Sequence, residues 1–279
     1  MSRCPSQRLS PERLPGCEGI RSWLGVPLFM YGGCEGVIAV QSSRPGAFRE
    51  DHQRLLESLA LQIFHPDFFG GSWAYCPDSV DFGDVEGINI YEDKNAFYKQ
   101  FEWRRVPTIN SREINGQIRQ TQMERNVFEL VSGTRGRSGE QLDIWSAVFG
   151  PLGNDGYFEP LWDKKTGVIN QKVADYWKEN YDLRYYLEKN WSTVGPKVVD
   201  KIRVYTGDAD NFFLNNSVRK LEEWMKKTRD PHYEGTFLYG AAKGHCWIGP
   251  VTQAERLKEM AQHMLGKMPR DAIANWWKP

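Results

Sequence analysis

The sequence predicts an α/β protein, in which a parallel sheet with a long inserted segment follows a small antiparallel hairpin and its helix. Three observations indicate this fold class. Short apolar runs that end in turn residues alternate with helical patterns in the second part of the chain. About 120 residues separate the first two of these runs, which is too long for a simple connection. Near the N-terminus, a glycine-rich turn joins two β-rich runs.

The composition is that of a globular protein and indicates no charged polymer as a partner. Of the 279 residues, 40% are hydrophobic and 26% are charged. The 36 Lys and Arg residues balance the 36 Asp and Glu residues, so the net charge is zero. Because nucleic acids and anionic membranes attract proteins with a basic surplus, we expect neither as a partner.

The cysteines and the absence of apolar targeting segments predict a reduced, cytoplasmic protein. The five cysteines are scattered, without a CxxC pair or a histidine at zinc-ligand spacing: Cys4, Cys17, Cys34, Cys76 and Cys246. We therefore expect reduced thiols, no metal and no cofactor. No apolar run approaches the roughly 20 residues that cross a bilayer, and residues 1–20 lack the apolar stretch of a signal peptide.

The first part of the chain predicts an antiparallel hairpin and one helix. Residues 22–30 and 37–42 are short, apolar and β-rich, and the intervening GGCEG at 32–36 supplies glycines for a tight turn. After an Arg-Pro-Gly turn, residues 48–63 place leucines, an alanine and an isoleucine on one face at helical spacing. We expect this helix to cover the hairpin.

The second part predicts parallel strands that alternate with helices. Residues 71–76, 201–206 and 236–239 are typical of buried strands. The last two strands precede helices over residues 216–227 and 252–265. This order of strand, helix, strand and helix favours a parallel sheet.

Both helices are expected to pack through apolar faces. The first lines up Val218, Leu221, Trp224 and Met225. The second opens with Thr252 and Glu255 as a capping box. Its inward residues are expected to be Ala254, Leu257, Met260, Ala261, Met264 and Leu265.

An acidic segment and a histidine follow two successive strands of the predicted sheet. The strand 201–206 runs into Asp208 and Asp210, and His245 follows the strand 236–239. Ligands of open α/β sheets bind beyond the carboxyl ends of the strands. A carboxylate that accepts from Nδ1–H of a histidine leaves Nε2 free as a general base, and the order acid before histidine is that of α/β hydrolases. The alternative is an aspartate that caps a loop beside a hydrogen-bonded histidine, without catalysis.

Four segments carry a more specific resemblance: ESLALQIFHPDFFGGSWAYCPDSVDF, GTRGRSGEQLDIWSAVFGP, RVYTGDADNFFLNN and GHCW. Through them, the chain from about residue 57 to its end resembles a bacterial esterase family of the α/β hydrolase superfamily. The resemblance implies a partial hydrolase sheet with a cap over about residues 84–199 and a small ester as substrate. It also implies that Asp210 is the catalytic acid and His245 the catalytic base, whereas Asp208 follows its strand too closely.

The chain departs from this family at the nucleophile. Such esterases carry a serine in a GxSxG elbow directly before the helix that here begins ESLALQ. The residues at 49–56 are REDHQRLL, so this elbow is missing. The strands before it and the oxyanion-hole loop are missing too. The resemblance therefore implies an esterase-like half that keeps the acid and the histidine but is inactive.

The segment in place of the missing half resembles a different family. Residues 21–63, which begin RSWLGVPLFM and end LLESLALQI, are similar to the C-terminal half of a GAF domain, a small sensory and ligand-binding module. Residues 1–65 contain seven Arg and no Lys, which favours a boundary near residues 55–65. We therefore divide the chain into a partial GAF-like segment, 1–63, and a hydrolase-like part, 64–279.

Other nucleophilic side chains are expected to be structural. Cys34 matches a GxCxG pattern, but the β run after it predicts a hairpin turn rather than a nucleophile elbow. Ser58 is expected to pack within a helix, and Ser138 to lie in a loop. Cys76 and Cys246 are expected to be packing thiols.

The remaining candidates indicate no metal site. Four histidines are expected at the surface or in loops: His52, His65, His232 and His263. Three carboxylates miss the calcium-loop pattern: Asp155, Glu159 and Asp163. Five tryptophans of the inserted segment either line an acyl or aryl pocket or pack its core: Trp103, Trp145, Trp162, Trp177 and Trp191.

Two further interpretations stand beside the inactive esterase. The chain is alternatively a non-enzymatic binding or regulatory protein whose GAF-like segment makes the contacts, or a chimera, a fusion product without selected function. The strands of a parallel sheet are normally flanked on both sides, so a sheet without its neighbours is expected to expose an edge. Self-association follows unless the hairpin covers that edge.

Overall fold

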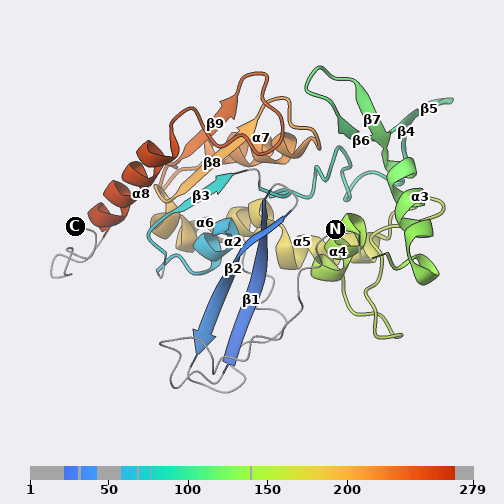
Figure 1. The fold of residues 1–279 in the computed structure, drawn as a ribbon, viewed down its shortest axis with the longest axis horizontal. Helices are drawn as coiled ribbons and strands as arrows, with labels where there is room; N and C mark the ends of the chain where they lie inside the picture. Colours follow the sequence, from blue (N-terminus) through green and yellow to red (C-terminus); the bar gives the residue numbers. More distant parts are fainter. Residues whose placement is uncertain are drawn as a thin grey trace. The chain divides into compact units, whose positions relative to one another are not determined.

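The chain forms two compact units, residues 1–61 and 62–279. The structure is a computed structural model, drawn as a ribbon in Figure 1. It describes residues 22–30, 33–42, 58–67, 69–75, 77–138 and 140–267. Within this part of the chain, no helix combines the length and the apolar character needed to cross a membrane.

The first unit contains two antiparallel strands. β1 (Ser22–Met30) pairs with β2 (Gly33–Ser42), and the register places Met30 opposite Gly33. β2 starts earlier than the strand predicted at 37–42. Cys34 therefore lies in β2, opposite Phe29, and the prediction that it belongs to the turn is wrong.

The helix α2 (Ser58–Phe64) lies at the boundary between the units. It coincides with the end of the helix predicted over 48–63, and positions 48–57 lie outside the described residues. The side chain of Gln62 is fully buried and donates from Nε2 to the carbonyl oxygen of Phe69 at 3.2 Å. The ring of Phe64 packs on Tyr186 with 4.5 Å between centroids.

A three-stranded parallel sheet forms the centre of the second unit, which confirms the predicted parallel arrangement. β8 (Ile202–Gly207) lies between β3 (Ser72–Tyr75) and β9 (Thr236–Gly240) (Figure 1). Because β8 has a neighbour on each side, its residues form a nearly continuous buried run. At Gly207 a Cβ atom would lie 2.1 Å from the carbonyl oxygen of Lys243, so only glycine lets the loop after β9 approach the end of β8.

Each of the last two strands precedes a helix, as predicted. α7 (Leu214–Met225) follows β8 and buries Val218, Leu221 and Met225. α8 (Gln253–Lys267) follows β9 and begins with the predicted capping box. The carboxylate of Glu255 accepts from the backbone N–H of Thr252 at 2.8 Å, and the N–H of Glu255 donates to the Thr252 hydroxyl at 3.3 Å.

The predicted inward face of α8 is wrong at three of its six positions. Ala254, Leu257 and Ala261 are exposed, and Leu257 is exposed by 58%. Met260 and Leu265 are half-buried, and two polar side chains of the helix also contact the sheet. The guanidinium of Arg256 lies over the ring of Tyr75, and the His263 ring stands edge-on to Trp73. Amphipathic spacing does not predict the contacts of Arg256 and His263, because they are cationic and aromatic rather than aliphatic.

The segment between β3 and β8 folds into two hairpins and several helices, in the range predicted for the insertion. β4 pairs antiparallel with β5, and β6 with β7. Figure 1 shows these hairpins and α3 at one end of the unit and α8 at the other. The elements are β4 (Tyr98–Phe101), β5 (Arg104–Pro107), β6 (Ile109–Arg112), β7 (Ile118–Thr121), α3 (Gln122–Ser132), α4 (Gln141–Phe149), α5 (Gln171–Tyr181) and α6 (Leu183–Val198).

Candidate functional site

The loops after β3, β8 and β9 bring polar side chains to the carboxyl edge of the sheet. Asp78 follows β3, Asp210 follows β8 and His245 follows β9. Because the three strands are parallel, their carboxyl ends lie on the same side of the sheet. This edge is where ligands of open α/β sheets bind.

Asp210 and His245 form a hydrogen-bonded pair. Oδ2 of Asp210 lies 2.9 Å from Nδ1 of His245. Asp210 is fully buried, whereas the His245 side chain is 29% exposed. The other carboxylate oxygen, Oδ1, accepts from the backbone N–H of Phe212 at 2.8 Å and of Leu214 at 3.3 Å. These donors lie at the amino end of α7, where the helix dipole favours a negative charge.

This arrangement fixes the proton on His245. The buried carboxylate is an acceptor, so Nδ1 is the donor and Nε2 is left as the acceptor of the neutral ring. The contacts of His245 among the described residues are to Asp210, to Asn211 and to the ring of Phe212, and none of them involves Nε2. Nε2 has no hydrogen-bond partner within the part of the chain that the structure describes, and it could accept from a hydroxyl or a water molecule of a bound ligand.

The structure brings Asp210, and not Asp208, to His245. Oδ1 of Asp208 accepts from the N–H of Ala242 at 2.8 Å, in the loop after β9. Asp208 therefore joins the loops that follow β8 and β9, while Asp210 reaches the imidazole.

Two residues in a strained backbone conformation flank the pair. Phe213 has φ of 62° and Cys246 has φ of 61°, in the left-handed region that side chains other than glycine rarely adopt. Such strain costs on the order of 1–3 kcal/mol per residue and concentrates at functional sites. Here it bends the chain directly after the loop of Asp210 and directly after His245.

Cys246 is disulfide-bonded, which corrects two predictions. It is neither a reduced thiol nor a simple packing residue. The covalent bond restrains the chain immediately after His245, in addition to the bend at φ of 61°.

Asp78 is a polar residue of this edge that the sequence analysis did not single out. Burial raises the pKa of the Asp78 carboxyl, and the charge of His245 opposes the rise. Its position directly after a parallel strand is the signal that could have identified it.

The other predicted nucleophile candidates belong to other elements or lie outside the described residues. Cys34 lies in a strand, and Ser58 is the first residue of α2. The Ser138 hydroxyl donates to Asp143 at 2.9 Å and accepts from the N–H of Glu140, as expected for a loop serine. Cys76 lies outside the described residues.

The described residues contain no group of three or more His, Cys, Asp or Glu side chains that could hold a metal ion. Asp155 forms an ion pair with Arg137, and Asp163 accepts from its own loop at Thr166. His263 is a residue of α8 and does not lie free at the surface. Its Nδ1 is within hydrogen-bond distance of the Arg203 guanidinium, and its Nε2 is within hydrogen-bond distance of the carbonyl oxygen of Gly70. His52 lies outside the described residues.

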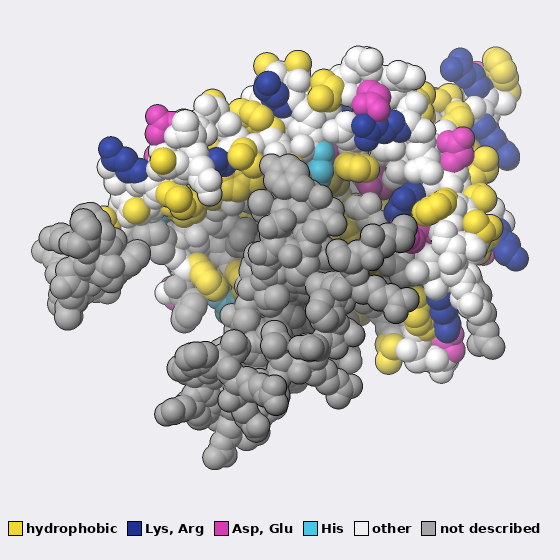
Figure 2. All heavy atoms as spheres, in the orientation of Figure 1, with side chains coloured by type: hydrophobic (Ala, Val, Ile, Leu, Met, Phe, Trp, Pro, Cys, Tyr) yellow, Lys and Arg dark blue, Asp and Glu magenta, His cyan; other side chains and the backbone are white. Residues whose placement is uncertain are grey.

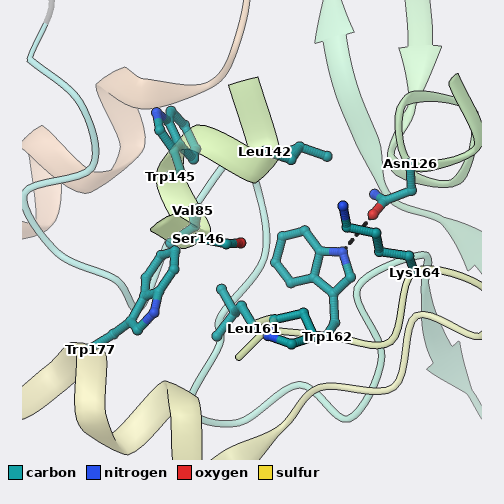
Figure 3. A pocket seen from close by; sticks show the side chains of 10 residues that line it. Val85, Asn126, Leu142, Trp145, Ser146, Leu161, Trp162, Lys164 and Trp177 are labelled. Carbon is teal, nitrogen blue, oxygen red and sulfur yellow. Dashed lines mark hydrogen bonds between the residues drawn. The ribbon is translucent and has the colours of Figure 1, made fainter. Parts of the chain in front are cut away.

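Three of the five tryptophans of the insertion belong to its core and line one small cavity. Trp145, Trp162 and Trp177 line this cavity together with Ser146 and Lys164 (Figure 3). The cavity has room for about one water molecule. Trp191 packs separately, edge-on to Trp224. Trp103 is 87% exposed, in the turn between β4 and β5.

One family model matches the N-terminal part of the chain. A GAF domain model matches residues 2–63. The match includes the segment 21–63 that resembles this family and begins nearer the N-terminus. No match to this chain is found among curated proteins or among solved structures.

Proposed function

We propose that the second unit carries the acid and histidine of an ester-hydrolase site and binds a small ester or its products without triad-dependent turnover. The 2.9 Å contact between Asp210 Oδ2 and His245 Nδ1, at the carboxyl edge of a parallel sheet, supports this proposal. A buried carboxylate on Nδ1 holds the imidazole in the tautomer in which Nε2 accepts a proton. A hydroxyl or a water molecule of the bound ligand would donate to Nε2.

The sequence before α2 is the reason that the proposal excludes turnover. The residues at 49–56, REDHQRLL, contain no GxSxG elbow. Loss of a triad nucleophile lowers kcat by on the order of 10⁶. An ester bound beside His245 would therefore survive long enough for its binding to be measured.

Histidine NMR of the full chain tests the binding. We expect phenyl butyrate to shift the Nε2 resonance of His245 in a saturable manner. His232 serves as an internal control, because its Nδ1 lies 3.0 Å from the carbonyl of Thr228, away from the sheet edge. If neither phenyl butyrate nor its products phenol and butyrate move the His245 signal, the site does not bind esters.

Hydrolysis of p-nitrophenyl butyrate tests the absence of turnover. Wild-type protein and His245→Ala should give the same rate, and a fluorophosphonate probe should label no serine. A labelled serine, together with turnover that His245→Ala abolishes, would show that a complete triad is present.

The GAF domain match over residues 2–63 favours a second function, small-molecule binding or regulation by the first unit. Hydrogen exchange of the full chain in the presence of individual metabolites separates this function from the first. Ligand-dependent protection of peptides from residues 22–42 would support it. Protection confined to the peptides around Asp210 and His245 would assign the binding to the second unit instead.

A further inference from the structure

Three consecutive residues hold His245. Asp210 meets Nδ1 of the ring, as described above. Oδ1 of Asn211 accepts from the backbone N–H of His245 at 2.9 Å. The ring of Phe212 stands edge-on to the imidazole, with 5.2 Å between the centroids and an angle of 89°. The loop after β8 therefore determines both the position of the His245 backbone and the plane of its ring.

The same loop is held from the other side by Arg112, the last residue of β6. The backbone N–H of Arg112 donates to the carbonyl oxygen of Asn211 at 2.9 Å, and Nδ2 of Asn211 donates to the carbonyl oxygen of Arg112 at 2.8 Å. Nε of Arg112 donates to the carbonyl oxygen of Asp210 at 3.1 Å. Its guanidinium lies 4.3 Å from the centroid of the Phe213 ring.

The side chain of Asn211 links these two sets of contacts. Its oxygen accepts from the backbone N–H of His245 and its nitrogen donates to the carbonyl oxygen of Arg112. If the amide were rotated by 180°, its NH2 group would face the His245 N–H and its oxygen would face the Arg112 carbonyl, so both hydrogen bonds would be lost. The side chain therefore has one orientation that satisfies both ends. A shift of the Arg112 carbonyl is transmitted to the backbone of His245.

The turn of the β6–β7 hairpin also touches the histidine loop directly. A Cβ atom at Gly244 would lie 2.6 Å from Oδ1 of Asn211 and 3.2 Å from Cγ1 of Ile114. Glycine at this position allows the hairpin and the Asn211 amide to pack against the chain just before His245.

We propose that Arg112 and Asn211 are positioning residues, through which the inserted β6–β7 hairpin sets the orientation of His245. The inference deepens the proposed function, since it concerns the same acid and histidine pair. It depends on neither ester binding nor turnover. A ligand that displaces the hairpin would move the imidazole, and one that clamps the hairpin would fix it.

Hydrogen exchange and NMR of the full chain test this proposal. Arg112→Met keeps the backbone bonds to Asn211 and removes the hydrogen bond from Nε to the Asp210 carbonyl, together with the cation over Phe213. We expect it to speed exchange of the His245 amide about tenfold, the change that corresponds to that one hydrogen bond, and to weaken the low-field signal of the His245 Nδ1 proton. Arg112→Lys should restore part of both readouts because it keeps the cation near Phe213. Arg119→Met is the matched control, because Arg119 lies on β7 but pairs with Glu113 at the surface.

Asn211→Asp separates the two ends of the bridge. It keeps an oxygen for the N–H of His245 and replaces the donor to Arg112 with a second oxygen. The proposal requires that this variant speed His245 exchange as Arg112→Met does, while exchange at Val204 in the centre of β8 stays unchanged. Wild-type exchange at His245 in either variant would overturn the proposal. So would equal acceleration at Val204, which would indicate a general loss of stability.

These readouts also separate this inference from the proposed function. If phenyl butyrate leaves the His245 signal unmoved but Arg112→Met and Asn211→Asp loosen His245, the positioning role stands and the ester site fails. If phenyl butyrate shifts the His245 signal but neither variant changes His245 exchange, the ester site stands and the positioning role is rejected.

Discussion

Glu86 is a buried carboxyl within the inserted segment, and its environment favours the neutral form. Its Oε2 accepts from Nδ2 of Asn110 at 2.6 Å and from Nε2 of Gln122 at 3.0 Å. Burial raises the pKa of Glu86 to about 8, although the hydrogen bond from Gln122 and the charge of Arg125 oppose the rise. The folded protein therefore keeps a proton on Glu86 at neutral pH.

We predict that Glu86→Gln removes a pH dependence of stability. The ordinary pKa of a glutamate is 4.5, so the unfolded chain releases the Glu86 proton at lower pH than the folded chain. Between pH 4.5 and about 8 the folded state binds the extra proton, and the free energy of unfolding falls as the pH rises. The free energy of unfolding of the glutamine variant, relative to that of wild type, should therefore rise across this window. The rise should be on the order of a few kcal/mol at the upper end of the window.

Urea unfolding at pH 5, 7 and 9 checks this prediction. Glutamine keeps an oxygen for Asn110 and Gln122, so the hydrogen bonds survive the change. Glu92→Gln, at an exposed position, is the matched control and should track wild type. A constant difference between Glu86→Gln and wild type at all three pH values would contradict the raised pKa.

The disulfide of Cys246 leads to a second prediction at the residue scale. We expect Cys246→Ser to lower the free energy of unfolding by about 2–5 kcal/mol, the usual effect of losing a native disulfide. Dithiothreitol should bring wild type down to the level of the variant and leave the variant unchanged. Peptide mapping without reductant identifies the partner cysteine, and recovery of Cys246 as a free thiol would refute the bond.

Sequence reasoning could single out Asp210 and His245 because each follows a short apolar strand. It could not find the disulfide, since pairing depends on distances between sulfur atoms that spacing along the chain does not give. It also passed over Asp78, although this aspartate follows β3 in the same way. The difference is that no helix follows β3 directly, so the repeating pattern of strand and helix stops there.

The helix α3 shows why the elements of the insertion were harder to predict than those of the sheet. It buries Gln122, Asn126 and Glu129 and exposes Val127 and Val131. Figure 2 shows hydrophobic side chains at the surface in this part of the unit, interspersed with Lys and Arg. An amphipathic pattern assumes apolar residues inside, so it assigns this helix the wrong face. The strands β3, β8 and β9 lie within a residue or two of their predicted positions, and β8 is buried along nearly its whole length as expected, whereas Leu238 of β9 is exposed.

We predict that Asn126→Leu destabilises the protein although it places an apolar side chain at a buried position. Oδ1 of Asn126 accepts from the indole N–H of Trp162 at 2.7 Å, and Nδ2 donates to the carbonyl of Gln122 at 2.7 Å. Leucine leaves the indole N–H buried and unpaired, which costs about 1–3 kcal/mol. Val131→Gln on the exposed face should stay within about 0.5 kcal/mol of wild type. Guanidinium unfolding measures both variants, and a more stable Asn126→Leu would refute the reversed polarity of α3.

At the scale of the whole molecule, the length of the chain between the first two parallel strands predicts an insertion but not its internal fold. Two hairpins and several helices fill that interval. Their core depends on contacts of tryptophans with residues that are distant in the sequence, such as the contact of Trp162 with Asn126. The sheet itself could be predicted because its strands are apolar and short. The sequence of the two outer strands does not show whether another element pairs with their outer edges.

The outer strands of the parallel sheet lead to the last prediction. In the described part of the chain, β3 and β9 each pair with β8 alone, so each presents one edge without a partner strand. Unpaired N–H and C=O groups on such an edge recruit a strand from another molecule unless a charge prevents it. We therefore expect the sedimentation coefficient of the full chain to rise with protein concentration. Leu238→Lys, which places a charge on β9 at a residue exposed by 39%, should reduce this rise. Val131→Lys tests the apolar face of α3 as the competing contact. A concentration-independent monomer, or association that only Val131→Lys suppresses, would show that the sheet edges do not drive assembly.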